Sequence, residues 1–173
     1  TAMASQITSA AQNALRGINK PQLSSDGNEY WYKLSTPNRG SRYLTSNGVG
    51  VAAVGNEANN LAKSQWKFVD RGDGTADIVN RGDGTFLNPN SAYNSAIQTI
   101  AQQPAKGWAF DYCNAPGLYI INSGTVQLNQ TQSDLGWKIY NWSSRSDGCD
   151  RDDKGCQYRI ELVTEDPEEI VVE

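Results

Sequence analysis

Residues 76–87 of the chain read Ala-Asp-Ile-Val-Asn-Arg-Gly-Asp-Gly-Thr-Phe-Leu. The first five residues alternate as a strand does, the glycine-rich pentapeptide after them is typical of a tight turn, and Phe86-Leu87 begins a second strand. Strands also precede two comparable pairs, Tyr43-Leu44 and Gln127-Leu128. The three leucines are 43 and 41 residues apart. This spacing indicates three copies of one strand-and-turn unit.

A second marker recurs together with the leucines, because each copy ends with a tryptophan that is followed by an alternating strand. These tryptophans are Trp66, Trp108 and Trp137. Since they recur with the copies, we interpret all three as core residues that fill the interior. A final strand over residues 157–163 is expected to pair near the first strand, at 30–35, and so remove exposed sheet edges.

Three copies and a closing strand favour an all-β fold, a β-trefoil with three pseudo-repeats over residues 30–163. A propeller blade of similar length needs at least four copies, which this chain does not hold. A β-sandwich is the alternative fold, although it gives no reason for the periodic tryptophans.

Two flanking segments differ from this pattern. Residues 4–19 place Ile7, Ala10, Ala14 and Leu15 on one stripe, which predicts a short N-terminal helix within an N-terminal segment and linker at 1–29. Residues 164–173 carry acids without a base and predict an acidic linker or the start of a neighbouring module.

Charge and composition exclude several functions. The chain has 15 basic and 19 acidic residues, a net charge of −4, and thus no electrostatic footprint for nucleic acid or an anionic membrane. No apolar run is long enough for membrane insertion. The sequence contains no histidine, which removes the usual general base and the Ser-His-Asp and Cys-His pairs. A glycosidase needs only two carboxylates, but the acids here occupy turns and the tail. We expect no catalysis and no cofactor.

The cysteines and the acidic loop near the end leave two alternatives open. Cys149 and Cys156 flank a short loop and suit one disulfide in an exported protein, but with Cys113 the odd count is equally compatible with three thiols. The loop at 147–155 holds four carboxylates, yet Lys154 stands where a calcium loop of the EF-hand type needs oxygen. We interpret the loop as a solvated insertion and expect no metal.

The pentapeptide Arg-Gly-Asp-Gly-Thr occurs twice, at 71–75 and 81–85. Its Arg-Gly-Asp core invites a cell-adhesion interpretation. However, Asp-Gly between alternating strands is a strong hairpin signal, in which both central residues need positive φ. We interpret both pentapeptides as turns.

The order of a strand, a Leu-containing strand, a polar stretch and then Gln and Trp resembles the ricin-type β-trefoil lectin repeat, which ends in Gln-x-Trp. Gln65-Trp66 keeps a glutamine, whereas the other copies read Lys106-Gly-Trp108 and Leu135-Gly-Trp137. The segments after Trp137 and Gly155 are also similar to trefoil modules of secreted glycan-processing enzymes of gut Bacteroidetes. The resemblance implies an accessory module linked to a catalytic domain, outside the cell, in the periplasm or at the cell surface.

Sugar sites in ricin-type lectins place an Asp after the marker leucine and an aromatic ring a short strand later. Here the corresponding positions hold Thr45, Asn88 and Asn129, none of which is ionised. The third copy reads as shortened, since only nine positions separate Leu128 from Trp137. The family's ligand specificity therefore does not carry over.

The most favourable polar cluster combines amides with one ring in the second copy, over a span long enough for a shallow pocket. Trp142 does not recur with the three copies, and it offers another ring for stacking on a sugar. The predicted ligand-binding residues are Asn88, Asn90, Tyr93, Asn94, Gln98 and Trp142. An ordinary hydrated loop explains the asparagines equally well, and packing at the barrel rim explains Trp142 equally well.

Two functional hypotheses follow. The first is a non-catalytic carbohydrate-binding accessory module whose partner is a glycan or glycoconjugate. The second is a structural spacer or protein-interaction trefoil that has lost its sugar sites, which the absence of all three aspartates favours.

Overall fold

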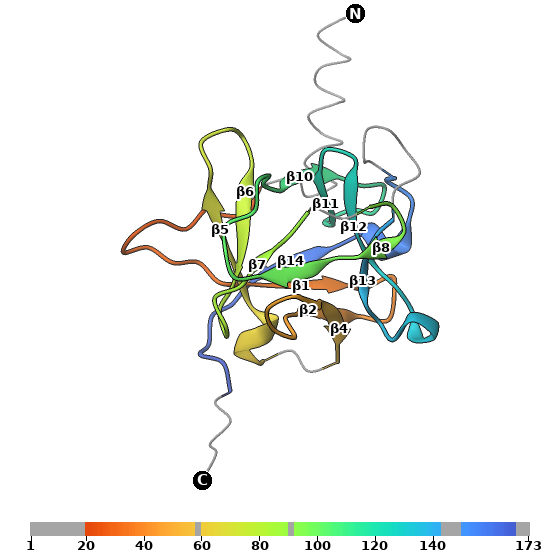
Figure 1. The fold of residues 1–173 in the computed structure, drawn as a ribbon, viewed down its shortest axis with the longest axis horizontal. Helices are drawn as coiled ribbons and strands as arrows, with labels where there is room; N and C mark the ends of the chain where they lie inside the picture. Colours follow the sequence, from red (N-terminus) through yellow and green to blue (C-terminus); the bar gives the residue numbers. More distant parts are fainter. Residues whose placement is uncertain (1–19, 58–59, 90–91, 143–149, 169–173) are drawn as a thin grey trace, which may run out of the picture.

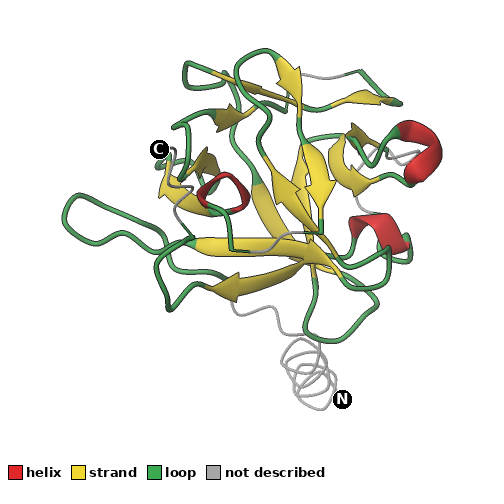
Figure 2. Ribbon diagram, turned by 90° about the horizontal axis from the view of Figure 1, so that it is seen from below, coloured by secondary structure: helices red, strands yellow, loops and turns green. Residues whose placement is uncertain are grey.

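The computed structural model describes residues 20–57, 60–89, 92–142 and 150–168 (Figure 1). The helix predicted over 4–19 lies outside these residues. Strands make up nearly all of the regular structure that is described (Figure 2). The strands are β1 (Tyr32–Thr36), β2 (Arg42–Thr45), β3 (Val51–Ala52), β4 (Val54–Asn56), β5 (Trp66–Asp70), β6 (Ala76–Asn80), β7 (Phe86–Leu87), β8 (Ser95–Ala96), β9 (Gln98–Ile100), β10 (Ala109–Tyr112), β11 (Tyr119–Ser123), β12 (Val126–Gln130), β13 (Ile139–Asn141) and β14 (Arg159–Leu162). Three short 3₁₀ helices are η1 (Ala62–Ser64), η2 (Ser133–Leu135) and η3 (Lys154–Cys156).

Six strands, two from each copy, form a closed ring. Antiparallel pairing joins β14 to β1, β1 to β5, β5 to β6 and β10 to β11. Two bridges, Ala76 to Trp108 and Tyr119 to Tyr158, complete the ring at the ends of β6 and β11. The predicted pairing of the last strand with the first is confirmed, since β14 lies along β1 (Figure 1). A barrel closed in this way leaves no unpaired edge strand.

Three hairpins close one end of the barrel: β2 with β4, β7 with β9, and β12 with β13. They meet in a triangle of backbone hydrogen bonds. The amide of Ala53 donates to the carbonyl of Ile97 (2.9 Å), Ile97 donates to Ile139 (2.8 Å), and Ile139 donates back to Ala53 (2.8 Å). All three side chains are buried. This closed cycle, one residue from each copy, gives the molecule the pseudo-threefold axis of a β-trefoil.

The three marker leucines and the tryptophans of the first two copies lie in the core as predicted. Leu44, Leu87 and Leu128 are fully buried, and so are Trp66 and Trp108. The indole Nε1 of Trp66 donates to the Leu44 carbonyl (2.8 Å), and that of Trp108 donates to the Leu87 carbonyl (3.0 Å). Each tryptophan thus ties the end of its copy to the marker strand of the same copy.

The prediction that Trp137 is the third core tryptophan is wrong. Trp137 has a left-handed backbone (φ 58°), and its half-buried ring stacks on the Arg42 guanidinium, 3.9 Å from the ring centroid. Tyr158 takes the core position instead, because its bridge to Tyr119 corresponds to the bridge between Trp108 and Ala76. The third copy is therefore extended by the loop before Tyr158 rather than shortened.

The segments flanking the barrel also contact it. The Ser24 amide donates to the Phe68 carbonyl (2.7 Å), and the Gln22 amide donates to the Tyr32 hydroxyl (2.8 Å). At the other end, the Glu168 amide donates to the Asn60 carbonyl (2.8 Å). Within the described residues, no helix has the length and apolar character needed to cross a membrane.

Both Arg-Gly-Asp-Gly-Thr segments form turns, as predicted. In each, a carboxylate oxygen of the Asp accepts hydrogen bonds from the amide and hydroxyl of the Thr two residues later: Asp73 from Thr75, and Asp83 from Thr85. The positive φ expected at the aspartates is not found. The residues with positive φ in these turns are glycines. These are Gly72, Gly74 and Gly84.

Candidate functional site

The six predicted ligand-binding residues do not form one cluster. Asn88 and Gln98 face each other across the second-copy hairpin, where the Asn88 amide donates to the Gln98 carbonyl (3.0 Å). Asn90 lies outside the described residues. Tyr93 and Asn94 lie in the loop before β8, close to the third copy. The structure therefore separates the predicted set into a hairpin pair and a group near Trp142.

The rings of Tyr93 and Trp142 come together, with centroids 6.1 Å apart and planes tilted by 45°. Both are exposed, Tyr93 by 55% and Trp142 by 37%. The cause is strand pairing between copies, because β8 aligns antiparallel with β13 and places Ser95 opposite Asn141. The Asn94 amide, at a left-handed residue (φ 59°), extends this pairing by donating to the Asn141 carbonyl (2.8 Å).

Trp142 also borders a shallow open hollow of about 270 Å³ on the third copy. The hollow is lined by Arg39, Asn129, Thr131, Gln132, Asp134, Leu135, Trp142 and Asp153. It holds Asn129, the residue after the third marker leucine. The third copy, which the sequence suggested was truncated, thus carries an amide and an exposed ring beside one hollow.

Asp153 organises the polar side of this hollow. One carboxylate oxygen accepts from the Asn129 side-chain amide (3.1 Å), and the other accepts from the Gly155 backbone amide (2.9 Å). Arg39 lies 3.6 Å from the same carboxylate and donates to the Gln130 carbonyl (3.3 Å). Because each group is held by at least one partner, the cluster presents fixed donors and acceptors.

Gly155 is required for this close packing. A Cβ atom at this position would lie 2.6 Å from both Asn129 Oδ1 and the Gln130 carbonyl oxygen. Real Cβ atoms do not approach other heavy atoms so closely. A side chain here would displace Asn129 and distort the polar wall of the hollow.

Cys156 lies directly behind the cluster as a fully buried thiol. It forms no disulfide within the described residues, and Cys149 lies outside them. The Asn129 side-chain amide donates to its Sγ (3.1 Å). Burial, with the nearby Asp153 carboxylate as a smaller cause, raises the pKa of the Cys156 thiol far above its ordinary value of 9.0. The thiol therefore stays protonated at neutral pH and is structural rather than nucleophilic.

The corresponding position in the first copy is already occupied by internal hydrogen bonds. Thr45 is buried, and its hydroxyl shares a hydrogen bond with the Ser64 hydroxyl (2.8 Å) and donates to the Tyr43 carbonyl (2.9 Å). The three copies share a core but not a surface. In the third copy this position, Asn129, borders a hollow that is also lined by the exposed Trp142.

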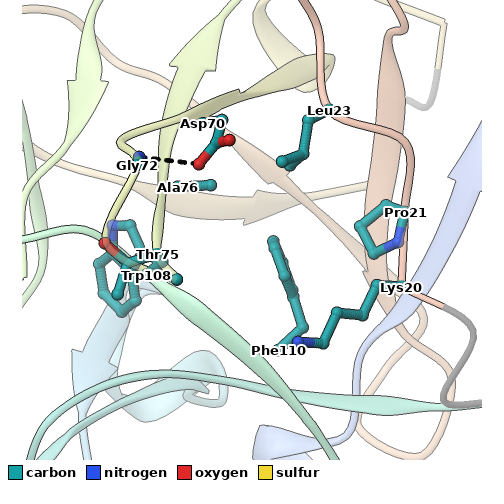
Figure 3. A pocket seen from close by; sticks show the side chains of 10 residues that line it. Lys20, Pro21, Leu23, Asp70, Gly72, Thr75, Ala76, Trp108 and Phe110 are labelled. Atoms are coloured by element: carbon teal, nitrogen blue, oxygen red, sulfur yellow. Dashed lines mark hydrogen bonds between the residues drawn. The ribbon is translucent and has the colours of Figure 1, made fainter.

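A larger hollow, of about 390 Å³, lies beside β5, β6 and β10. Phe110 points into it, between Lys20 and Leu23 on one side and Asp70 on the other (Figure 3). Asp70 is turned toward its own turn, where it accepts from the Gly72 amide (2.8 Å). The hollow is mainly apolar and lacks the set of fixed polar groups found on the third copy.

Sequence reasoning missed Arg39 and Asp153 as site residues. Asp153 was visible only as one acid among four in a loop, and Arg39 lies in a turn of the first copy. The one available signal was Asn129, which follows a marker leucine. Among the described residues, no group of three or more acidic or cysteine side chains is arranged to hold a metal ion.

The comparisons with known proteins support the fold. No protein-family model matches the sequence, and no curated protein sequence matches it. The designed threefold-symmetric protein ThreeFoil is 18% identical, with a TM-score of 0.62, over 76% of this chain and 97% of that one. A Macrolepiota procera ricin B-like lectin, in complex with lactose, is 13% identical, with a TM-score of 0.61, over 82% of this chain and 99% of that one.

A third similar structure belongs to a larger protein, a GlcNAcα1-4Gal-releasing endo-β-galactosidase from Clostridium perfringens. It is 11% identical with a TM-score of 0.62, and the match covers 78% of this chain but only 32% of the enzyme. At such identities the likeness establishes the fold and leaves the ligand open. The chain is a β-trefoil of the architecture seen in ricin B-like lectins.

Proposed function

We propose that this chain is a non-catalytic carbohydrate-binding module and that the third-copy hollow is its sugar site. The observation that carries the proposal is the exposed Trp142 ring beside the hydrogen-bonded cluster of Asn129, Asp153 and Arg39. The larger hollow into which Phe110 points does not combine these features.

The chemistry of a sugar fits this arrangement. A pyranose has an apolar face of C–H groups, which stacks on an aromatic ring, and a rim of hydroxyls that both donate and accept hydrogen bonds. Trp142 supplies the ring. Asp153 supplies acceptor oxygens and Arg39 supplies donors. Asn129 supplies its side-chain oxygen as a further acceptor, because its amide nitrogen already donates to Asp153 and Cys156. Because neighbouring groups already hold these side chains, little side-chain entropy is lost on binding.

The finer proposal is an accessory role in a secreted or cell-surface glycan-processing protein. It is supported by the resemblance of the repeats to such modules. It is also supported by the endo-β-galactosidase, in which the matched region is about a third of the chain. In this role the module holds a glycan, or a glycoconjugate, while a linked catalytic domain acts on it.

The test is a glycan array followed by calorimetric titration, with the wild type compared with Trp142→Ala. The wild type is expected to bind at least one class of glycan without turnover. Loss of the indole is expected to weaken binding by about tenfold or more, since stacking and apolar burial are both removed.

Trp31→Ala is the matched control. The Trp31 ring lies outside the hollow, between Lys67 and Arg81. This variant is expected to retain the affinity of the wild type, provided that both variants unfold cooperatively. Equal binding by wild type and Trp142→Ala would place the sugar elsewhere, and no binding by the wild type would favour a spacer or protein-interaction role.

A further inference from the structure

Tyr93 lies beside the proposed sugar site but comes from a neighbouring copy. It belongs to the loop between β7 and β8 of the second copy, yet its ring lies 6.1 Å from that of Trp142 on the third copy. With 55% of its surface exposed, Tyr93 is one of the most exposed large apolar side chains among the described residues. Single exposed aromatics are ordinary, but two adjacent ones beside a polar hollow indicate a ligand surface.

The position of Tyr93 is fixed by backbone hydrogen bonds rather than by the ring contact alone. Pairing of β8 with β13 places Ala96 opposite Tyr140 and Ser95 opposite Asn141. The Asn94 amide continues the ladder to the Asn141 carbonyl (2.8 Å). Tyr93 is the next residue along this loop, and Trp142 is the next residue after β13. The two rings are therefore held at the end of one antiparallel pair.

The angle between the rings decides how much ligand they can hold. Their planes differ by 45°, so one flat pyranose face cannot lie against both rings at once. Two consecutive sugar units can, because the glycosidic linkage allows adjacent rings to tilt relative to each other. The polar cluster lines the same hollow as Trp142, whereas Tyr93 does not line it.

We infer that Tyr93 forms a second subsite, so that the chain binds two consecutive units of an oligosaccharide rather than a single sugar. One unit lies in the hollow on Trp142, and its neighbour stacks on Tyr93. This inference rests on the proposed function of the third-copy hollow. It makes oligosaccharides the ligand class and gives the molecule one composite site, built from two copies.

The experiment uses an array in which each terminal sugar is printed alone and also as the end of di- and trisaccharides. The mono-, di- and trisaccharide that share the terminal sugar with the strongest signal are then titrated in solution against wild type, Tyr93→Ala and Tyr93→Phe. Tyr93→Ala is expected to weaken binding of the di- and trisaccharide about three- to tenfold and to leave the monosaccharide unchanged. Tyr93→Phe keeps the ring and is expected to retain most of the affinity.

Comparing the loss of affinity for the monosaccharide with the loss for the oligosaccharides distinguishes a subsite at Tyr93 from a supporting role. If Tyr93 only holds Trp142 in place, Tyr93→Ala weakens the monosaccharide and the oligosaccharides equally, and the inference is overturned. It is also overturned if Tyr93→Ala changes nothing. If the wild type binds no printed glycan, the proposed function itself fails, which is a different result. Leu162→Ala, an exposed change on β14 outside the hollow, is the control and should bind like wild type.

Discussion

At the scale of single residues, the third core anchor differs chemically from the other two. The indole groups of Trp66 and Trp108 each donate to the carbonyl of a marker leucine. Tyr158 is fully buried in the equivalent place, but its hydroxyl has no hydrogen-bond partner among the described residues. Burial also raises the pKa of this phenol well above 10.0. An unpaired buried hydroxyl costs about 1–3 kcal/mol.

Tyr158→Phe is therefore expected to stabilise the protein. The substitution removes the unpaired hydroxyl and keeps the ring, so the free energy of unfolding should rise by about 1 kcal/mol. Urea unfolding followed by fluorescence measures this change. The control is Tyr32→Phe. The Tyr32 hydroxyl accepts from the Gln22 amide (2.8 Å), so its removal should lower the free energy of unfolding by about 1 kcal/mol. A destabilised Tyr158→Phe would show that the hydroxyl is paired in solution.

Tyr158 also shows why the third anchor could not be predicted. The sequence offered a tryptophan, Trp137, followed by an alternating strand, and nothing local distinguished it from Trp66 and Trp108. Trp137 instead has a left-handed backbone (φ 58°), and its ring stacks on Arg42, which is far away in the sequence. The aromatic character of position 158 was visible, but its equivalence depends on the bridge to Tyr119. Residue identity alone does not reveal such long-range pairing.

At the scale of elements, the short strand β8 joins the second copy to the third. Its pairing with β13 relies on Asn94, which has a left-handed backbone (φ 59°). Asparagine tolerates this conformation better than most residues, and glycine adopts it without steric cost. The element that positions Tyr93 thus depends on one residue's backbone preference.

Asn94→Ala is expected to lower the free energy of unfolding by about 1 kcal/mol, because a Cβ is strained at positive φ without the local hydrogen bonding that asparagine offers. Asn94→Gly should be nearly neutral. Chemical denaturation of the two variants measures the difference. Equal stability of the two would mean that position 94 is not held in the left-handed region in solution.

The elements also show how much the sequence could predict. The strands over 76–80 and 86–87, the three marker leucines and the closing pair of β1 and β14 were all predicted from periodicity, because the pattern reports burial directly. Of the residues at the candidate site and beside it, the sequence predicted only the two that carry aromatic rings. Tyr93 and Trp142 were chosen separately, and their contact arises from the pairing of β8 with β13, two elements that no local pattern joins.

At the scale of the whole molecule, the barrel is closed by the last strand. β14 pairs with β1 over four residues, from Tyr32 opposite Leu162 to Ser35 opposite Arg159. Just before it, Tyr158 bridges to Tyr119 with hydrogen bonds in both directions, of 2.8 and 2.9 Å. The first and third copies are thus joined through residues near the C-terminal end, which makes closure a long-range event that forms few local contacts.

Truncation after Gln157 is expected to abolish cooperative folding. It removes Tyr158 and β14, together with the pairing that they give to β1 and to Tyr119. It also opens the buried core cluster that Tyr158 shares with Leu34 and Ile121. The loss of one large aromatic core side chain alone costs about 3–5 kcal/mol, comparable with the stability of a small domain. Truncation after Glu168 keeps all of these contacts and serves as the control. Thermal unfolding followed by circular dichroism should show a sharp transition for the longer chain only. A sharp transition in the shorter chain would mean that two copies and the hairpin cap fold without barrel closure.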